Sequence, residues 1–166
     1  NVTVGVSSSD TTEGAVSPSS VTFTSANWNT AQTVTVTGAD DALDDGDLAF
    51  SVVTDAASSA DGQYNGIDPS DVSATNTDND AAGITVTPTS LTLAEAGGTG
   101  SFTVVLTSQP VGEVVIGLSS TDGGTATADL SSLTFTAATW NVAQVVTVTG
   151  VDNAIDEADR TATIVT

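Results

Sequence analysis

Hydrophobic and polar residues alternate in short stretches along most of the chain, which is typical of strands with one buried and one exposed face. Turn-forming residues such as Pro88, Gly97, Pro110 and Gly124 separate these stretches. In the second half of the chain the alternating stretches cover residues 83–88, 90–97, 100–108, 113–120, 132–137, 143–150 and 161–166. Short strands at this spacing predict an all-β fold built from immunoglobulin-like antiparallel β-sandwich modules.

The chain also repeats itself. Residues 2–10 match residues 114–122, and residues 19–47 match residues 131–159, at a constant offset of 112 residues. Such repetition predicts tandem modules. We expect one module over residues 1–82 that lacks its first strands, and a second over residues 83–166 that lacks its last strand. Two explanations of this phase stay open: the chain is an excerpt of a longer array, or neighbouring copies complete each module by strand exchange.

The composition excludes several kinds of function. The chain has 21 acidic residues and one basic residue, Arg160, for a net charge of −20, and it contains no His, Cys or Met. Without His or Cys it can form no disulfide, no usual zinc site and no usual nucleophilic dyad, so we expect no enzyme. Nucleic-acid binding requires basic side chains, and no apolar run is long enough to predict a membrane span or a signal peptide.

The acidic residues concentrate in turns. The run GADDALDDGDLAF at residues 38–50 holds five Asp, and residues 152–159 repeat its acidic pattern. In the predicted strand order, these turns lie at the same pole of a module as the turns that carry Asp10, Glu95 and Asp122, and as the exit segment TDND at residues 77–80. Clustered carboxylates repel one another unless a cation or protons neutralise them.

Carboxylate and carbonyl oxygens in this number suit Ca²⁺, which takes about 6–8 oxygen ligands in flexible geometry. Mg²⁺ fits less well because it requires strict octahedral sites. The alternative interpretation is a solvated acidic loop that serves solubility. Recurrence of the pattern within the chain favours the calcium interpretation.

Four motifs occur in order along the second half of the repeat: E-x-G-G at Glu95, LTFTxxxWxxAQxVTVTG at residues 133–150, an acidic turn, and the TDND exit seen at residues 77–80. Together they resemble the Calx-beta domain and related repeats of large bacterial surface proteins and adhesins. The resemblance implies calcium ligands in the early Glu, in the acids after the fifth strand and in the acidic exit. Carried over, these are Asp40, Asp41, Asp44, Asp45, Asp78 and Asp80 in the first module, and Glu95, Asp152, Asp156 and Glu157 in the second.

From these features we expect a structural repeat of a large secreted or cell-surface bacterial protein, such as an adhesin stalk, a matrix fibre or a surface filament. Ca²⁺ at module junctions is expected to stiffen it, with neighbouring repeats, or copies of the same protein, as its partners. Two other hypotheses stay open: a module that binds a glycan or other ligand, and a self-assembling filament completed by strand exchange.

Three aromatic residues are candidate contact points. Trp28 and Trp140 fall at equivalent positions before a strand, and we expect both to pack over the edge of the sandwich rather than to stack on sugars. Tyr64 lies in a polar loop, DGQYNGIDPSD, for which a surface turn is the favoured interpretation.

Overall fold

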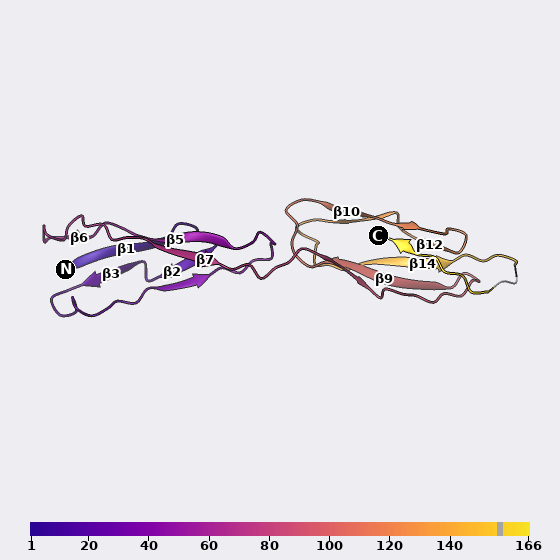
Figure 1. The fold of residues 1–166 in the computed structure, drawn as a ribbon, viewed down its shortest axis with the longest axis horizontal. Coiled ribbons are helices and arrows are strands. Elements are labelled where there is room, and N and C mark those ends of the chain that lie inside the picture. Colours follow the sequence, from indigo (N-terminus) through magenta and orange to yellow (C-terminus); the bar gives the residue numbers. More distant parts are fainter. Residues whose placement is uncertain (156–157) are drawn as a thin grey trace. The chain divides into compact units, whose positions relative to one another are not determined.

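Antiparallel strands make up the regular secondary structure of residues 1–155 and 158–166, which are the residues that the computed structural model describes. No helix occurs among them, so the predicted all-β fold is confirmed. The chain divides into two units (Figure 1). Unit 1 consists of residues 1–41 and 45–79, and unit 2 consists of residues 42–44 and 80–166.

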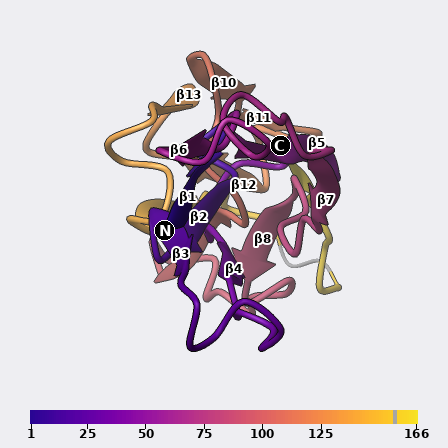
Figure 2. The same ribbon diagram turned by 90° about the vertical axis from the view of Figure 1, so that its left-hand side faces the viewer.

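In unit 1, the largest sheet has the strand order β3-β1-β5-β7, with β6 paired to β1, and β2 and β4 form a separate two-stranded sheet. Figure 2 shows β1 and β3 of this unit end-on. The strands are β1 (Val2–Ser8), β2 (Gly14–Ser17), β3 (Ser20–Phe23), β4 (Thr35–Gly38), β5 (Leu48–Thr54), β6 (Ser58–Ser59) and β7 (Val72–Asn76).

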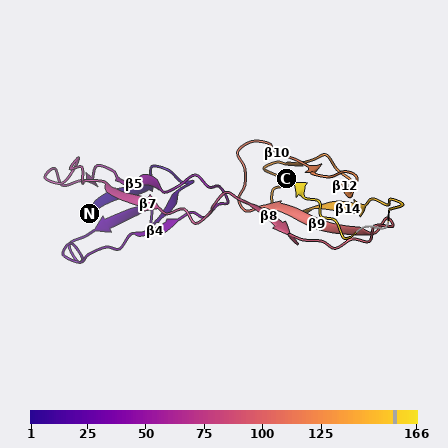
Figure 3. The same cartoon turned by 45° about the vertical axis from the view of Figure 1, so that its right-hand side comes forward.

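In unit 2, a four-stranded sheet has the order β12-β14-β9-β8, and β10 pairs with β13 while β11 pairs with β15. Figure 3 shows β8, β9 and β14 running side by side. The strands are β8 (Ile84–Thr87), β9 (Thr99–Leu106), β10 (Val114–Gly117), β11 (Ser119–Ser120), β12 (Ala126–Ala128), β13 (Ser132–Phe135), β14 (Gln144–Gly150) and β15 (Ile164–Val165).

Strand pairing follows the same register in both units. The β1–β3 ladder pairs Val2 with Phe23, and the β10–β13 ladder pairs Val114 with Phe135, each partner 112 residues further along. The β2–β4 and β12–β14 ladders correspond in the same way. Similar alternating sequences therefore adopt the same local pairing, as period-2 patterns require when one face is buried.

The two units differ in how much of their interior is buried. In unit 2, ten buried residues form one cluster, to which β9 contributes Phe102, Val104 and Leu106. In unit 1, the buried cluster consists of Val6, Phe50 and Val52, with Val16, Val34 and Ala74 partly buried against it. The β9 strand of unit 2 therefore accounts for a large part of the core that unit 1 does not have.

One predicted strand is wrong, and one observed strand was not predicted. Residues 90–97 form no strand. Leu93 packs against the core, which explains the alternation, but a tight turn in which the Gly98 N–H donates to the Ala94 carbonyl follows at once. The unpredicted strand, β12, has three residues and directly follows the turn at Asp122–Gly124. Side-chain alternation alone does not distinguish a strand in a ladder from an extended segment that packs on a core.

Candidate functional site

The acidic turn of unit 1 lies between β4 and β5, and the exit segment follows β7. The β5–β7 ladder begins with Leu48 opposite Asn76. This register places the end of the turn beside the start of the exit segment, because both leave the ladder at the same edge. The predicted proximity of the acidic turn to the exit segment is therefore confirmed within unit 1.

Hydrogen bonds join the turn to the exit segment. The Gly46 N–H donates to Asp78 Oδ2 at 2.8 Å, and the Asp78 N–H donates to Asp47 Oδ1 at 3.0 Å. Gly46 has φ +79°, a left-handed conformation that glycine adopts without strain and that turns its N–H toward Asp78. Asp47 thus acts as an acceptor for the backbone of the exit segment.

A residue that the sequence reasoning missed, Glu13, lies at the same place. The β2–β4 ladder pairs Gly14 with Gly38, so the residue before β2 meets the residue after β4, and the Ala39 N–H donates to the Glu13 carbonyl at 3.0 Å. Asn76 donates its side-chain amide to Glu13 Oε2 at 3.3 Å and to the Ala39 carbonyl at 2.7 Å. Half-buried Glu13 is therefore held against the acidic turn by Asn76.

The electrostatics of Asp45 report the crowding of charge. Desolvation raises the pKa of the Asp45 carboxyl above its ordinary value, and the negative charges of Asp41, Glu13 and Asp78 raise it further. These four carboxylates come from three separate segments of unit 1, which we call the carboxylate cluster. No basic side chain occurs in unit 1, because the single basic residue of the chain is Arg160.

The other predicted ligands of the first module are distributed differently. Asp40 is exposed and belongs to unit 1 with the carboxylate cluster. Asp44 and the half-buried Asp80 belong to unit 2. There, the Ala82 N–H donates to Asp44 Oδ2 at 2.8 Å, so Asp44 has a structural role as a backbone acceptor.

At the acidic pole of unit 2, two of the predicted ligand segments come together. The Asn153 N–H donates to Glu95 Oε1 at 3.3 Å, and the Ile155 N–H donates to Asn153 Oδ1 at 2.7 Å. Exposed Asp152 precedes Asn153 in the same loop. The remaining predicted ligands, Asp156 and Glu157, lie outside the described residues.

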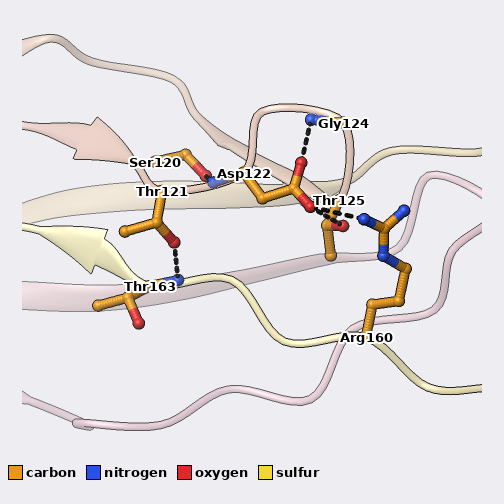
Figure 4. A network of polar contacts seen from close by, with 7 residues as sticks. All are labelled: Ser120, Thr121, Asp122, Gly124, Thr125, Arg160 and Thr163. Carbon is orange, nitrogen blue, oxygen red and sulfur yellow. Dashed lines mark hydrogen bonds and ion pairs between the residues drawn. The ribbon is translucent and has the colours of Figure 1, made fainter.

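Asp122 of unit 2 is committed to a local network (Figure 4). Its Oδ1 accepts the Gly124 N–H at 2.9 Å, and its Oδ2 accepts the Thr125 hydroxyl and Arg160 Nη2, each at 2.9 Å. The Thr125 and Gly124 hydrogen bonds, with a smaller contribution from the Arg160 charge, lower the pKa of the Asp122 carboxyl. The matching Asp10 of unit 1 accepts the Thr12 hydroxyl and N–H, which lower its pKa as well. Both acids stabilise turns.

The residues fit a hard cation by the chemistry of their donors. Carboxylates, a side-chain amide and nearby carbonyls are the oxygen ligands that Ca²⁺ takes. Within residues 1–155 and 158–166, no three acidic side chains are arranged around one point so as to hold a metal ion as they stand. Asp41 and Asp45 are exposed, so their side chains can reorient around a bound ion without disturbing a core.

The aromatic candidates have different surroundings. Trp140 packs against the core cluster of unit 2, as predicted. Trp28 is 70% exposed, so the prediction that it packs over the sandwich edge is wrong. Tyr64 lies exposed in the predicted surface turn, where its N–H donates to the Asp61 carbonyl at 3.0 Å.

A groove of about 780 Å³ lies in unit 2. It runs between residues 86–95 and residues 158–166, over Phe102 and Val148 of the sheet. Charged groups at its margin come from Glu95, Asp159 and Arg160.

No protein-family model matches the chain, and neither the curated proteins nor the solved structures contain a match to it. Within the described residues, no helix is long and apolar enough to cross a membrane.

Proposed function

We propose that this chain is a structural repeat of a large extracellular bacterial protein, an adhesin stalk, matrix fibre or surface filament, and that Ca²⁺ stiffens it. The observation that carries the calcium part is the carboxylate cluster. Glu13, Asp41, Asp45 and Asp78 converge in a unit that has no basic side chain to balance them. A bound divalent cation offsets that repulsion most directly.

The proposed mechanical effect follows from which segments carry the cluster. Asp41 and Asp45 lie in the turn between β4 and β5, and Asp78 lies in the exit segment. In the absence of an ion, two hydrogen bonds between the Asp78 residue and the turn resist the repulsion of the three carboxylates. A cation shared by these groups would tie the exit segment to the turn more strongly, and the chain that leaves unit 1 would lose freedom.

The repeat part of the proposal is supported by the two halves of the sequence and by their strand registers, which agree at an offset of 112 residues. A repeated module that carries its own ion site suits a load-bearing array, because each module is stiffened independently. The affinity need not be high, since extracellular calcium modules work at about 10⁻⁴–10⁻³ M. The Calx-beta resemblance of the motifs supports the same function.

Thermal unfolding of the full chain tests the calcium part. We expect the melting temperature to be higher in millimolar Ca²⁺ than in EGTA, and Mg²⁺ at the same ionic strength to give a much smaller gain. Equal melting temperatures in all three conditions would remove calcium from the proposal. An equal gain from Ca²⁺ and Mg²⁺ would indicate general screening of charge.

Matched variants separate a specific site from the net charge of −20. Asp45→Asn removes one charge from the carboxylate cluster, and Asp68→Asn removes one from the loop between β6 and β7. The proposal predicts that Asp45→Asn reduces the calcium-dependent gain and that Asp68→Asn leaves it unchanged.

Ligand binding is the second candidate function, and the groove of unit 2 favours it. Such a module would bind a glycan or another small polar ligand through Glu95, Asp159 and Arg160. A glycan array probed with the full chain tests it: specific signals that Arg160→Ala abolishes would support the candidate, and an array without signals would reject it for the glycans tested.

A further inference from the structure

One sheet edge of unit 1 lacks the neighbour that the matching edge of unit 2 has. In unit 2, β14 pairs with β12 on one side and with β9 on the other. In unit 1, β4 pairs with β2. Within the described residues, no strand pairs with the other edge of β4, so its N–H and C=O groups on that side are available for a ladder.

The side chains that β9 covers in unit 2 have exposed counterparts in unit 1. Val148 of β14 is 3% exposed, whereas Val36 of β4, at the matching position, is 42% exposed. Trp140 is half-buried against the core, whereas Trp28 is 70% exposed. Together with half-buried Val34, Val36 and Trp28 form what we call the open face of unit 1.

The structure of unit 2 also shows what occupies the matching surface there. β8 and β9 form an antiparallel pair, and β9 lies along β14 with Phe102 opposite Val146 and Gly100 opposite Val148. The Leu106 N–H donates to the Trp140 carbonyl at 3.1 Å, so the end of β9 is also tied to the tryptophan.

From this correspondence we propose that the open face of unit 1 binds a two-stranded segment of the β8–β9 type, residues 83–107, from another copy of the repeat. The segment would add as a strand to β4 in the register seen in unit 2, with its Gly100 opposite Val36 and its Phe102 opposite Val34. Phe102, Val104 and Leu106 would enter the interior of unit 1, as they enter that of unit 2. This inference rests on the repeat part of the proposed function and is independent of calcium.

A synthetic peptide of residues 83–107, titrated into the full chain, tests the proposal. Trp28 is the reporter, and Trp140→Phe removes the second tryptophan signal. We expect a saturable shift of Trp28 emission to shorter wavelength, because docking covers an indole that is now mostly exposed. The shift should occur equally in Ca²⁺ and in EGTA, so a failure of the calcium proposal would leave this result intact.

Two controls make the result specific. Val36→Asp places a charge under the incoming strand and should weaken peptide affinity at least about tenfold, because burying an unpaired carboxylate is costly. Val72→Asp makes the same substitution at an exposed valine of β7, also in unit 1, and should leave affinity unchanged. A peptide with Ser in place of Phe102 and Val104 should not bind.

Hydrogen exchange provides a second measurement on the unmodified chain, in case Trp140→Phe does not fold. Peptide binding should slow amide exchange in residues 33–37, which gain ladder partners. Absence of both the emission shift and the added protection would overturn the proposal, as would equal weakening by Val36→Asp and Val72→Asp. A shift that grows with chain concentration and without peptide would also overturn it, because an intact second copy would then cover the face.

Discussion

β14 of unit 2 and β4 of unit 1 have almost the same sequence around Thr-Val-Thr-Gly, yet their side chains differ sharply in exposure. Val146 and Val148 are almost completely buried, whereas Val34 is half-buried and Val36 is exposed. Further from this edge the difference fades, since Ile116 of β10 and the matching Val4 of β1 are both buried. The comparison teaches that burial in this fold depends on whether a strand has a neighbour on each side, and much less on which residues it carries.

The largest expected effect comes from deleting matched aromatic residues. Phe135 of unit 2 is completely buried, and the matching Phe23 of unit 1 is half-buried. Phe135→Ala should destabilise unit 2 by about 3–5 kcal/mol, and Phe23→Ala should destabilise unit 1 by about half as much. Denaturant unfolding followed by Trp140 or Trp28 fluorescence, each in a variant without the other tryptophan, measures the two units separately. Equal losses would contradict the difference in burial.

The next effect concerns a compensating pair. A Cβ at Gly14 would overlap the ring of Phe50, which is buried and cannot move aside. The matching positions in unit 2 carry Ala126 and Ala162, which avoid the overlap with a smaller partner. Gly14→Ala should destabilise unit 1 by about 1–3 kcal/mol through overpacking.

The double variant Gly14→Ala, Phe50→Ala checks the physical reason for that loss. Its stability should exceed the value expected from adding the two single losses, because the overlap is gone once the ring is removed. Simple additivity would show that Gly14 is required for its backbone conformation instead.

Asp44 and Asp45 are adjacent, and they should respond oppositely when no ion is present. Asp44 accepts the Ala82 N–H, so Asp44→Ala should lower the melting temperature in EGTA, by a loss of about 1 kcal/mol. Asp45 suffers repulsion from Asp41, Glu13 and Asp78, so Asp45→Asn should raise the melting temperature in EGTA. A loss in both variants would indicate that Asp45 also stabilises the turn by a hydrogen bond.

The smallest effect is a difference in pH dependence between Asp122 and Asp45. The pKa of Asp122 is lowered in the folded chain, so its stabilisation is present above the ordinary Asp pKa and is lost as the pH falls through the lowered value. The pKa of Asp45 is raised, so folding gains stability as the pH falls through that value. In EGTA, the melting-temperature difference between Asp122→Asn and wild type should shrink in acid. The Asp45→Asn difference should shrink at a higher pH; shrinkage in the opposite order would contradict the assignment.

Much of the fold could be predicted from the sequence because period-2 alternation and turn residues act locally. The stretches at residues 100–108 and 143–150 became β9 and β14. Whether a strand has a neighbour is a non-local property, which is why Trp28 and Trp140, equivalent in sequence, were assigned the same surroundings and have different ones. The pattern around Leu93 failed for a similar reason, since packing on a core and pairing in a ladder give the same alternation.

The candidate site was partly predictable. Strand order alone brings the turn at Asp45 to the exit segment at Asp78, and the structure bears this out within unit 1. Glu13 was missed because the repeat comparison directs attention to acids that recur, and the matching position in unit 2 is Thr125. Its position before β2, beside the residue that follows β4, was the available signal.

Direct calcium titration by isothermal calorimetry tests the central claim most directly. The full chain should bind Ca²⁺ with a dissociation constant of about 10⁻⁴–10⁻³ M. Asp45→Asn should weaken that binding by about tenfold, since it removes one charge from the ion's ligand set, while Asp68→Asn leaves it unchanged. The absence of a binding isotherm for the wild-type chain, or the same isotherm for wild type and Asp45→Asn, would contradict the assignment of the carboxylate cluster as a calcium site.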